Sequence, residues 1–464
     1  MIRYISTRGQ APVLSFEQVV LAGLASDGGL YVPDQIPQLS KEELIRLKHL
    51  SYADLACEII PRFVDDSIDH DALKTIIHES YREFRHTEVA PLKKLDDSTY
   101  ILELFHGPTL AFKDFALQFL GRLLDHILSK KNQKVVVIGA TSGDTGSAAI
   151  AGCRGRANME IFILHPHERV SNVQRRQMTT VTDKNIHNLA IQGTFDDCQD
   201  IVKALFNDHT FREKHHLTAV NSINWARILA QVVYYFYAAL RLGAPERAVS
   251  FSVPTGNFGD IYAGYIAKRM GLPVEQLIIA TNRNDILART LETGTYGMQG
   301  VVPTISPSMD IQISSNFERL LFDLYDRDGD KIRDRMISFR AEQSLTLSPQ
   351  ALEKLRGDFA AGRASDDETS FAINAVYQKY GELLDPHTAI GYVVGERERL
   401  SRETPLVVLA TAHPAKFPAA VKAASTIDPA LPPHMSDLFE KEERFDVLKN
   451  SAGVVAAFID KICQ

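Results

Sequence analysis

Short apolar and β-branched runs alternate with longer helical patterns from residue 100 onward, and this alternation constrains the fold more than any other feature. Strands of parallel sheets are buried on both faces, so they are continuous apolar runs, and helices usually connect them. The sequence therefore predicts an α/β fold with parallel sheets. The predicted strands are residues 134–139, 159–164, 185–191, 248–253, 276–280 and 405–410.

The first 95 residues follow a different pattern, because apolar residues recur there at three- and four-residue spacing between turns. This spacing indicates a helical region ahead of the α/β part. A polar turn near residue 95 and loop-like sequence within 325–370 are the predicted boundaries. The predicted helices are residues 15–23, 41–50, 52–63 and 70–84.

Composition excludes several classes of protein. Of 464 residues, 45% are hydrophobic and 23% charged, and the net charge is −7, which argues against long disorder and against a generic nucleic-acid binder. Residues 1–30 lack the apolar core of a signal peptide, and the most apolar helical stretch, 228–240, is too short to span a membrane. The cysteines lie far apart without a C-x-x-C pair, which favours a reducing cytoplasm over a disulfide framework or zinc site. They are Cys57, Cys153, Cys198 and Cys463.

Two predicted strands end in glycine-containing loops that lead into helices. The first loop is "ATSGDTGSAAI", after residue 139, and the second is "PTGNFGD", after residue 253. Helix N-termini in α/β proteins offer unpaired backbone N–H groups and a partial positive charge to anions. Neither loop is a Walker loop or a dinucleotide fingerprint. Two such loops indicate a small anionic ligand in two parts, although a glycine turn can also serve only to cap a helix.

Lys113 lies in the first turn of a predicted amphipathic helix that begins near Ala111. A cation there opposes the helix dipole, at about 0.3–1 kcal/mol, and the neighbouring apolar stripe partly desolvates the amine. Both effects lower the pKa of a lysine, as a Schiff-base lysine requires. The alternative is a surface lysine that lies along the helix or pairs with Asp114.

Polar side chains gather at two other helix or strand ends. The segment "NSINWARI" places Asn221, Ser222 and Arg227 around a helix start, where they suit a phosphate monoester or, alternatively, only cap the helix. Thr411 follows the strand 405–410, at the end that faces the ligand crevice in this architecture. No metal site is expected, because the paired histidines of the chain have no carboxylate or cysteine cluster near them in sequence.

Together, these segments resemble the threonine synthase family, which comprises pyridoxal-phosphate enzymes of the tryptophan-synthase-β-like fold (fold type II). The likeness covers nearly the whole chain, and seven motifs occur in the family's order. Such an ordered set is far more specific than any one motif. The motifs are "YISTRG", "GLASDGGLYVP", "HGPTLAFKDF", "TSGDTGSAA", "NSINWARI", "PTGNFGD" and "ATAHPAKF".

The resemblance implies roles for individual residues. It implies that Lys113 carries pyridoxal 5'-phosphate covalently, that Thr411 meets the pyridine nitrogen, and that Asp144 lies near the ring hydroxyl. The residues expected to hold the cofactor phosphate are Gly256, Asn257, Phe258, Gly259 and Asp260. Those expected to bind the substrate α-carboxylate are Thr141, Ser142, Gly143 and Thr145. Those expected to bind the substrate phosphate are Asn221, Ser222 and Arg227.

The resemblance also implies an activity and a domain plan. The expected enzyme converts O-phospho-L-homoserine and water to L-threonine and phosphate by γ-elimination and β-hydration, the last step of threonine biosynthesis. The alternatives are a related phospho-lyase that releases a keto acid, and a non-catalytic ligand-binding protein. We expect a small-molecule substrate, no nucleic-acid or membrane partner, and a cytoplasmic monomer or homodimer. The expected parts are a helical domain 1–95, a smaller α/β domain 96–225 bearing the carboxylate loop, a larger cofactor-binding α/β domain 226–430, and a C-terminal segment 431–464.

Overall fold

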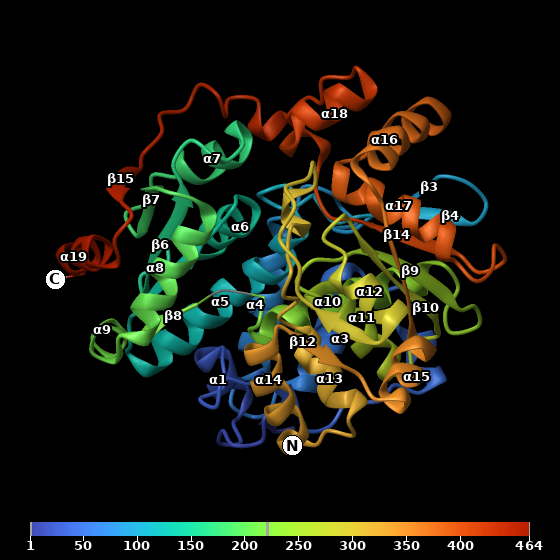
Figure 1. Ribbon diagram of the computed structural model, residues 1–464, viewed down its shortest axis with the longest axis horizontal. Helices are drawn as coiled ribbons and strands as arrows, with labels where there is room; N and C mark the ends of the chain where they lie inside the picture. The colour runs from blue at the N-terminus through green and yellow to red at the C-terminus, as the bar shows by residue number, and fades with distance from the viewer. Residues whose placement is uncertain (1, 220–221, 464) are drawn as a thin grey trace.

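The computed structural model describes residues 2–219 and 222–463, which form two lobes, each built around one sheet (Figure 1). The sheet of the larger lobe has the order β13-β10-β9-β14-β4-β3, with an antiparallel pair only between β3 and β4. Its strands are β3 (Leu92–Lys94), β4 (Thr99–Glu103), β9 (Val249–Pro254), β10 (Val274–Thr281), β13 (Phe359–Arg363) and β14 (Leu406–Ala410).

The sheet of the smaller lobe has the order β15-β7-β6-β5-β8, and all its pairs are parallel. Alternate residues of β5 belong to different cores: Val137 packs with α5 and α6, whereas Val136 and Ile138 pack with α8 and α19. Both faces are therefore covered, as the continuous apolar runs predict. The strands are β5 (Val135–Ala140), β6 (Met159–Pro166), β7 (Ile186–Gln192), β8 (Leu217–Thr218) and β15 (Asp446–Lys449). The helices are α5 (Lys113–Lys131), α6 (Asp144–Cys153), α7 (Asn172–Thr179), α8 (Phe195–Asn207), α9 (His209–His215) and α19 (Ala452–Ile462).

The α/β class, the parallel pairing and all six predicted strands are confirmed, with ends that differ by at most two residues from those predicted. The predicted domain ranges do not follow the sheets, however. Strand β4 lies within 96–225 but pairs with β14 of the larger sheet, and β15 lies within 431–464 but completes the smaller one. Pairing between distant strands leaves no local signal in a sequence, and the domain limits themselves stay a prediction.

The four predicted N-terminal helices are confirmed, and their starts follow from capping. Ser15 and Ser40 form capping boxes, and Ser51 and Asp69 each accept a backbone N–H at the head of a helix. These helices pack on the rest of the larger lobe next to a two-stranded pair, β1 (Tyr4–Ser6) and β2 (Tyr31–Pro33). They are α1 (Phe16–Ala22), α2 (Lys41–Leu47), α3 (Tyr52–Ile59), which continues into η1 (Ile60–Phe63), and α4 (His70–Arg82).

Two long helices place the site between the lobes. Helix α10 (Trp225–Arg241) is buried along nearly its whole length and packs on α3, α5 and α11 (Gly259–Arg269). Helix α5 packs on α10 and also on α6, so it connects the two lobes. The contact between α5 and α6 is close, because a Cβ on Gly121 would lie 2.1 Å from the Gly152 carbonyl oxygen.

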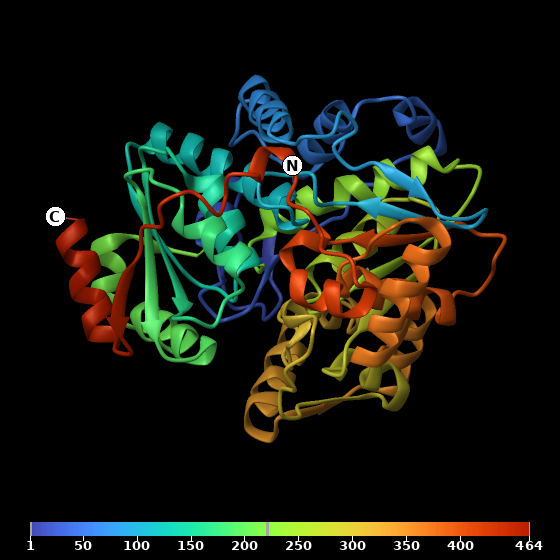
Figure 2. The ribbon, with the colours of Figure 1, turned by 90° about the horizontal axis from the view of Figure 1, so that it is seen from above.

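Helices α12 (Ile286–Thr293) and α17 (Pro386–Glu398) pack on the larger sheet, and the C-terminal segment returns to the smaller lobe. After η3 (Pro414–Lys416) and α18 (Pro418–Ser425), the chain crosses from one lobe to the other and adds β15 and α19 (Figures 1 and 2). Glu443 anchors this crossing to Arg175 of α7, with Nε 2.8 Å from the carboxylate. The other helices are α13 (Phe317–Leu324), α14 (Gly329–Glu342), α15 (Pro349–Asp358) and α16 (Asp366–Tyr380), with the short pair β11 (Thr295–Gly297) and β12 (Ser344–Thr346) and the turns η2 (Pro307–Met309) and η4 (Pro433–Met435).

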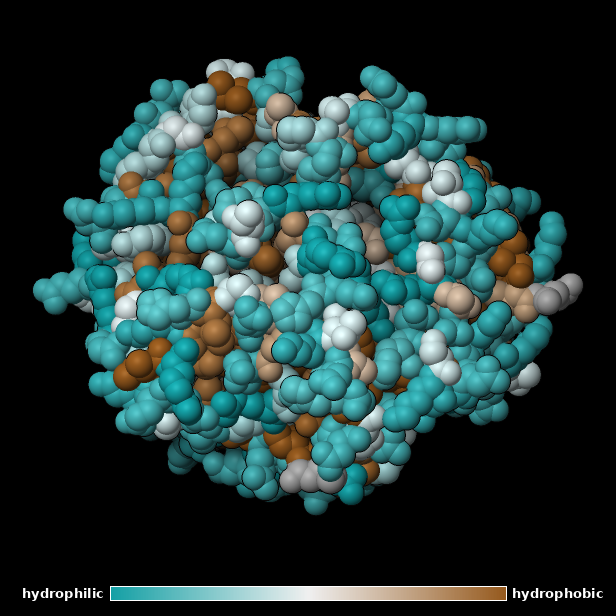
Figure 3. Space-filling model, turned by 180° about the vertical axis from the view of Figure 1, so that it is seen from behind, coloured by the Kyte–Doolittle hydropathy of each residue, from teal (hydrophilic) through white to brown (hydrophobic). Residues whose placement is uncertain are grey.

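Hydrophilic side chains cover most of the face in Figure 3, and hydrophobic ones form small separate groups. Within residues 2–219 and 222–463, no helix combines the length and the apolar character that crossing a membrane requires. All four cysteines lie in the described part, and their thiols are free.

Candidate active site

The two glycine-containing loops begin helices α6 and α11, and the N-cap residue of neither helix forms a side-chain cap. Their N-cap residues, Gly143 and Phe258, have φ angles of 141° and 65°. The first backbone N–H groups of a helix have no partner inside it, so each loop offers donors and a positive dipole end to an anion. This arrangement fits one anionic group at each lobe.

The loop of the smaller lobe is braced from inside. The Thr141 hydroxyl oxygen accepts the N–H groups of Gly143 and Gly146, both at 2.9 Å. Gly143 cannot carry a side chain here, because a Cβ would lie 2.6 Å from Gln174 Cδ. Ser142 is exposed and Thr145 half-buried, so their hydroxyls lie nearer the surface of the loop.

Lys113 is the first residue of α5, and its Nζ lies 3.5 Å from Asp144 Oδ2. Burial lowers the pKa of Lys113; Asp144 opposes this shift, whereas Lys416 and Arg227 add to it. The lowered pKa predicted from the sequence is confirmed. The alternative pairing with Asp114 is wrong, because the Asp114 carboxylate accepts the N–H and hydroxyl of Thr109 instead.

The Asp144 carboxylate is 4% exposed and joins residues of both lobes. Its Oδ1 lies 2.8 Å from Lys416 Nζ and accepts the Gln174 amide at 2.9 Å, and its Oδ2 accepts the Ser308 hydroxyl at 3.0 Å. Although burial opposes ionisation, the Lys416 and Lys113 ammonium groups hold the pKa of Asp144 well below its usual range. The carboxyl group is therefore ionised at neutral pH.

Sequence reasoning left three of these partners out of the site: Lys416, Gln174 and Ser308. Lys416 had a usable signal, since it follows β14 only a few residues after Thr411, at the same sheet edge. Gln174 and Ser308 lie in α7 and η2 and carry no motif that would distinguish them. Only the tertiary structure brings them to Asp144.

The loop of the larger lobe is held by its own neighbours. Ser314 Oγ donates to the Gly256 carbonyl at 2.6 Å, and Asn316 donates to the Asn257 carbonyl through both its backbone N–H and its side-chain amide, each at 3.1 Å. These bonds fix the carbonyls on one side of the loop. The Phe258 ring is buried against Phe317.

The Asp260 carboxyl group points away from this loop. It accepts the hydroxyls of Tyr234 at 2.5 Å and Tyr235 at 2.8 Å, both on α10. Burial raises the pKa of Asp260 to about 6, although the tyrosine bonds oppose the shift. Any contribution of Asp260 to a phosphate at the head of α11 therefore comes from its backbone N–H.

The remaining predicted residues lie around Lys113 to different extents. Thr411 is buried, and its carbonyl accepts the N–H of Phe112 at 2.9 Å, directly beside Lys113. Arg227 is 3% exposed in the first turn of α10, and burial lowers its pKa to about 10. Ser222 is half-buried, and Asn221 lies outside the described residues.

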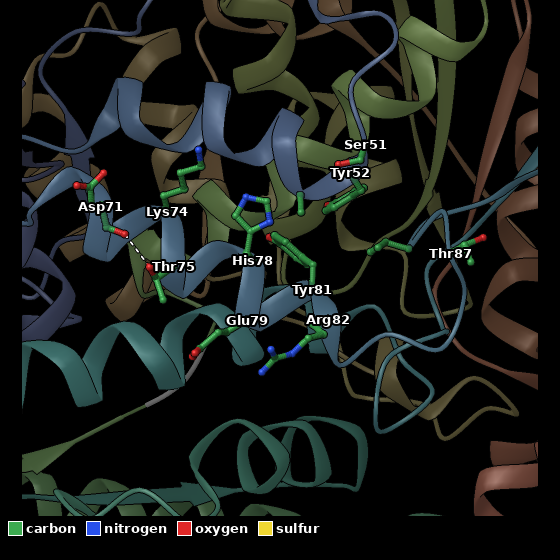
Figure 4. Close-up of a pocket in the computed structure, with 12 residues that line it drawn as sticks. Ser51, Tyr52, Asp71, Lys74, Thr75, His78, Glu79, Tyr81, Arg82 and Thr87 are labelled. Atoms are coloured by element: carbon green, nitrogen blue, oxygen red, sulfur yellow. Dashed lines mark hydrogen bonds between the residues drawn. The ribbon is translucent and has the colours of Figure 1, made fainter.

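A separate cavity of about 670 Å³ lies over α3 and α4 (Figure 4). Its lining mixes both charge signs, with Lys74 and Arg82 alongside Asp71 and Glu79. None of the predicted site residues lines it. Groups with jointly perturbed pKa values indicate chemistry better than volume does, so the Lys113 region is the candidate active site.

The residues around Lys113 fit a phosphorylated aldehyde such as pyridoxal phosphate. A half-buried amine with a lowered pKa can form a bond to the aldehyde carbon. The uncapped head of α11 can bind the phosphate, and Thr411 lies next to the start of α5, where its carbonyl accepts the N–H of Phe112.

Comparison with known proteins agrees with this fit. The chain matches three family models: "Threonine synthase N terminus" over residues 3–81, "Pyridoxal-phosphate dependent enzyme" over 83–346 and "Threonine synthase, C-terminal" over 388–459. A curated threonine synthase of Pseudomonas aeruginosa is 57% identical over 99% of this chain and 98% of its own.

Solved structures give the same result. A PLP-bound threonine synthase from Brucella melitensis is 53% identical with a TM-score of 0.98, and the match covers 100% of this chain and 99% of that one. The threonine synthase from yeast is 42% identical with a TM-score of 0.95, over 99% and 98% of the two chains. The chain therefore belongs to the threonine synthase family and is a pyridoxal-phosphate-dependent enzyme of fold type II.

Proposed function

We propose that the chain converts O-phospho-L-homoserine and water into L-threonine and phosphate, and that residues of both lobes carry out this reaction around the Lys113 amine. The observation that carries the proposal is the position of that amine. It lies half-buried 3.5 Å from Asp144, its pKa is lowered, and the Arg227 cation acts on it. The motif order and the family membership support the same activity.

Each group of residues has a binding task in this proposal. Lys113 bonds the cofactor, the N–H groups of residues 256–260 hold its phosphate, and Thr411 meets the pyridine nitrogen. Asp144 lies at the ring hydroxyl. The substrate α-carboxylate binds the loop of Thr141, Ser142, Gly143 and Thr145, and the substrate phosphate binds Asn221, Ser222 and Arg227.

Pyridoxal phosphate, when bound, supplies a conjugated ring that accepts electrons released at the substrate carbons. The chain supplies the proton transfers. A lysine with a lowered pKa has a larger unprotonated fraction, so the freed Lys113 amine can remove protons from Cα and Cβ. Arg227 orients the phosphate that leaves from Cγ, and Cγ then receives a proton from Lys113. Water adds its hydroxyl at Cβ, and a proton returns from Lys113 to Cα. One movable base serves several carbons.

We also propose the compartment, the oligomeric state and the partners of the enzyme. The protein works in the cytoplasm as a monomer or homodimer on a small-molecule substrate, with no nucleic-acid or membrane partner. The four free thiols and the mild negative charge support this setting.

The direct test is a product assay. Purified protein is incubated with pyridoxal phosphate and O-phospho-L-homoserine, and amino acids, keto acids and phosphate are separated. We expect threonine and phosphate in equal amounts. Formation of 2-oxobutyrate without threonine would identify a phospho-lyase, and absence of any turnover or of a borohydride-reducible chromophore would indicate a non-catalytic protein.

A further inference from the structure

Lys416 is buried to 0% exposure, and its ammonium group is bonded to both lobes. Nζ lies 2.8 Å from Asp144 Oδ1, and it donates to the Thr109 carbonyl at 2.7 Å. The residue belongs to η3 of the larger lobe, whereas Asp144 is the first residue of α6 in the smaller one. A charge so deeply buried is stable only when paired, so Lys416 and Asp144 depend on each other.

The pair also removes an electrostatic difficulty at Asp144. A carboxylate that faces the ring oxygen of the cofactor places two electron-rich oxygens together, which repel when both are ionised. Protonation would relieve the repulsion, but Asp144 is ionised because its pKa lies well below the usual range. The Lys416 ammonium offers the other solution, since it neutralises the carboxylate from the side that Gln174 also binds.

We propose that Lys416 is a positioning residue that acts through Asp144: it forms a charge-balanced pair with the carboxylate, and thereby lets that carboxylate lie beside both the cofactor ring oxygen and the Lys113 amine. The inference rests on the proposed assignment of Asp144 to the cofactor. It deepens that assignment, because the lysine in "HPAKF" then has a function of its own.

Two other roles for Lys416 make different predictions. If it only tethered η3 to the Thr109 carbonyl, its loss would not depend on the charge of residue 144. If it bound the substrate directly, its loss would lower turnover but leave cofactor affinity unchanged. A double-mutant cycle of Lys416→Met and Asp144→Asn separates these cases.

The first readout is the cofactor dissociation constant, from titration of cofactor-free protein with pyridoxal phosphate. Lys416→Met leaves the Asp144 carboxylate with only the Lys113 amine, 3.5 Å away, as a counter-charge, and Asp144→Asn leaves the buried Lys416 ammonium without a carboxylate, so we expect affinity to fall about tenfold or more in each. The double variant removes both charges of the Lys416 and Asp144 pair, so affinity should return to within about threefold of wild type.

The second readout is the pH midpoint at which the absorbance of the lysine-bound cofactor changes. The charged groups that act on Lys113 are Asp144 of α6, Lys416 of η3 and Arg227 of α10. Without the Lys416 cation the midpoint should rise by about one pH unit, and without the Asp144 anion it should fall by a similar amount. The two shifts should cancel in the double variant.

The matched control is the surface pair Lys422 and Asp428, 2.8 Å apart, changed to Met and Asn in the same combinations; both readouts should stay at wild-type values. Additive losses in the Lys416 and Asp144 cycle, or midpoints that do not move in opposite directions, would overturn the inference. If Lys416→Met does not fold, Lys416→Gln replaces it in the cycle. The expected fall of the absorbance pH midpoint in Asp144→Asn is then measured as well. If wild-type protein makes no threonine, the proposed function is refuted instead. The cofactor dissociation constants of the four proteins in the cycle still test the role of Lys416.

Discussion

The two lobes use the same local arrangement, a strand, a glycine-containing loop and a helix, but they hold the acidic residue in the first turn of that helix in opposite ways. Asp144 of α6 faces the other lobe and is bound there by Lys416 and Ser308. Asp260 of α11 faces inward and is bound by two tyrosines of α10. The first carboxyl is ionised, whereas burial raises the pKa of the second to about 6.

This difference corresponds to what each loop has to bind. The loop at residues 256–260 is braced by Ser314 and Asn316 of its own lobe, which suits a cofactor phosphate that stays in place. The loop at 141–146 has contacts across the gap between lobes, which suits a substrate that enters and leaves. Under the proposed assignment, the same local motif would hold a permanent ligand where its contacts stay within one lobe, and a transient one where they also reach the other lobe.

The largest expected effect comes from replacing Lys113. Lys113→Ala removes the base as well as the bond to the cofactor, so threonine formation should fall by about 10²–10⁴-fold or more from lost proton transfer alone. The measurements are the threonine assay and the visible spectrum, from which the lysine-bound absorbance should disappear. Lys130→Ala, at the other end of α5, is the control that should keep both. Full activity in Lys113→Ala would contradict the mechanism.

The next effect concerns the loop of the smaller lobe. Gly143→Ala places a side chain at φ 141° and within 2.6 Å of Gln174 Cδ, and a strained conformation of this kind costs about 1–3 kcal/mol. We expect kcat/KM to fall about tenfold, with KM for the substrate changed more than the dissociation constant of the cofactor. Gly300→Ala is the control, since a Cβ there has nothing within 4 Å among the described residues. An unchanged KM would show that the loop does not contact the substrate.

The third prediction separates the two carboxyl groups by pH. A carboxyl with a raised pKa favours the neutral form in the folded state, so its ionisation destabilises the protein as pH rises through about 6. Asp260→Asn removes this penalty, and should raise the free energy of unfolding at pH 7.5 by up to about 3 kcal/mol. The gain should shrink below pH 6 and vanish near pH 4.

The measurement is the difference in Tm between Asp260→Asn and wild type across this pH range, on cofactor-free protein. Asp144→Asn provides the contrast. Its carboxyl is ionised throughout the range, so we expect a loss of stability that does not vary between pH 5 and 8. The same pH profile in both variants would remove the distinction between the two helix starts.

The smallest effect is a change in dynamics. Binding of a phosphonate analogue of the substrate should increase hydrogen-exchange protection at residues 141–146 more than at 256–260. The first loop gains a ligand, whereas the second does not contact the analogue and is already held by hydrogen bonds within its own lobe. Mass spectrometry of exchanged peptides would measure both segments in one sample. Unchanged protection at 141–146 would count against a closing motion of the smaller lobe.

The parts of the fold that the sequence predicted are those set by local patterns. Continuous apolar runs predicted the strands, and apolar residues at three- and four-residue spacing predicted the N-terminal helices. The lowered pKa of Lys113 was also predictable, because the first turn of a helix and the edge of an apolar stripe are both read from spacing. Such features depend on neighbours within a few residues.

The parts that could not be predicted depend on which distant elements meet. Nothing in the chain indicates that Ser308 and Gln174 lie beside Asp144. Tyr234 and Tyr235 of α10 are buried in the core, and their hydroxyls also hold the Asp260 carboxyl away from the loop. A periodic pattern shows that a face is buried without showing which polar group it meets.

The C-terminal crossing has a consequence for synthesis of the protein on the ribosome. Strand β15 is made after every other strand of the smaller sheet, so β7 has an open edge until residue 449 has emerged from the exit tunnel. Unpaired strand edges attract other chains. The nascent smaller lobe is therefore exposed to misassembly while residues 193–449 are being made, and the final strand and helix α19 end that period by covering it.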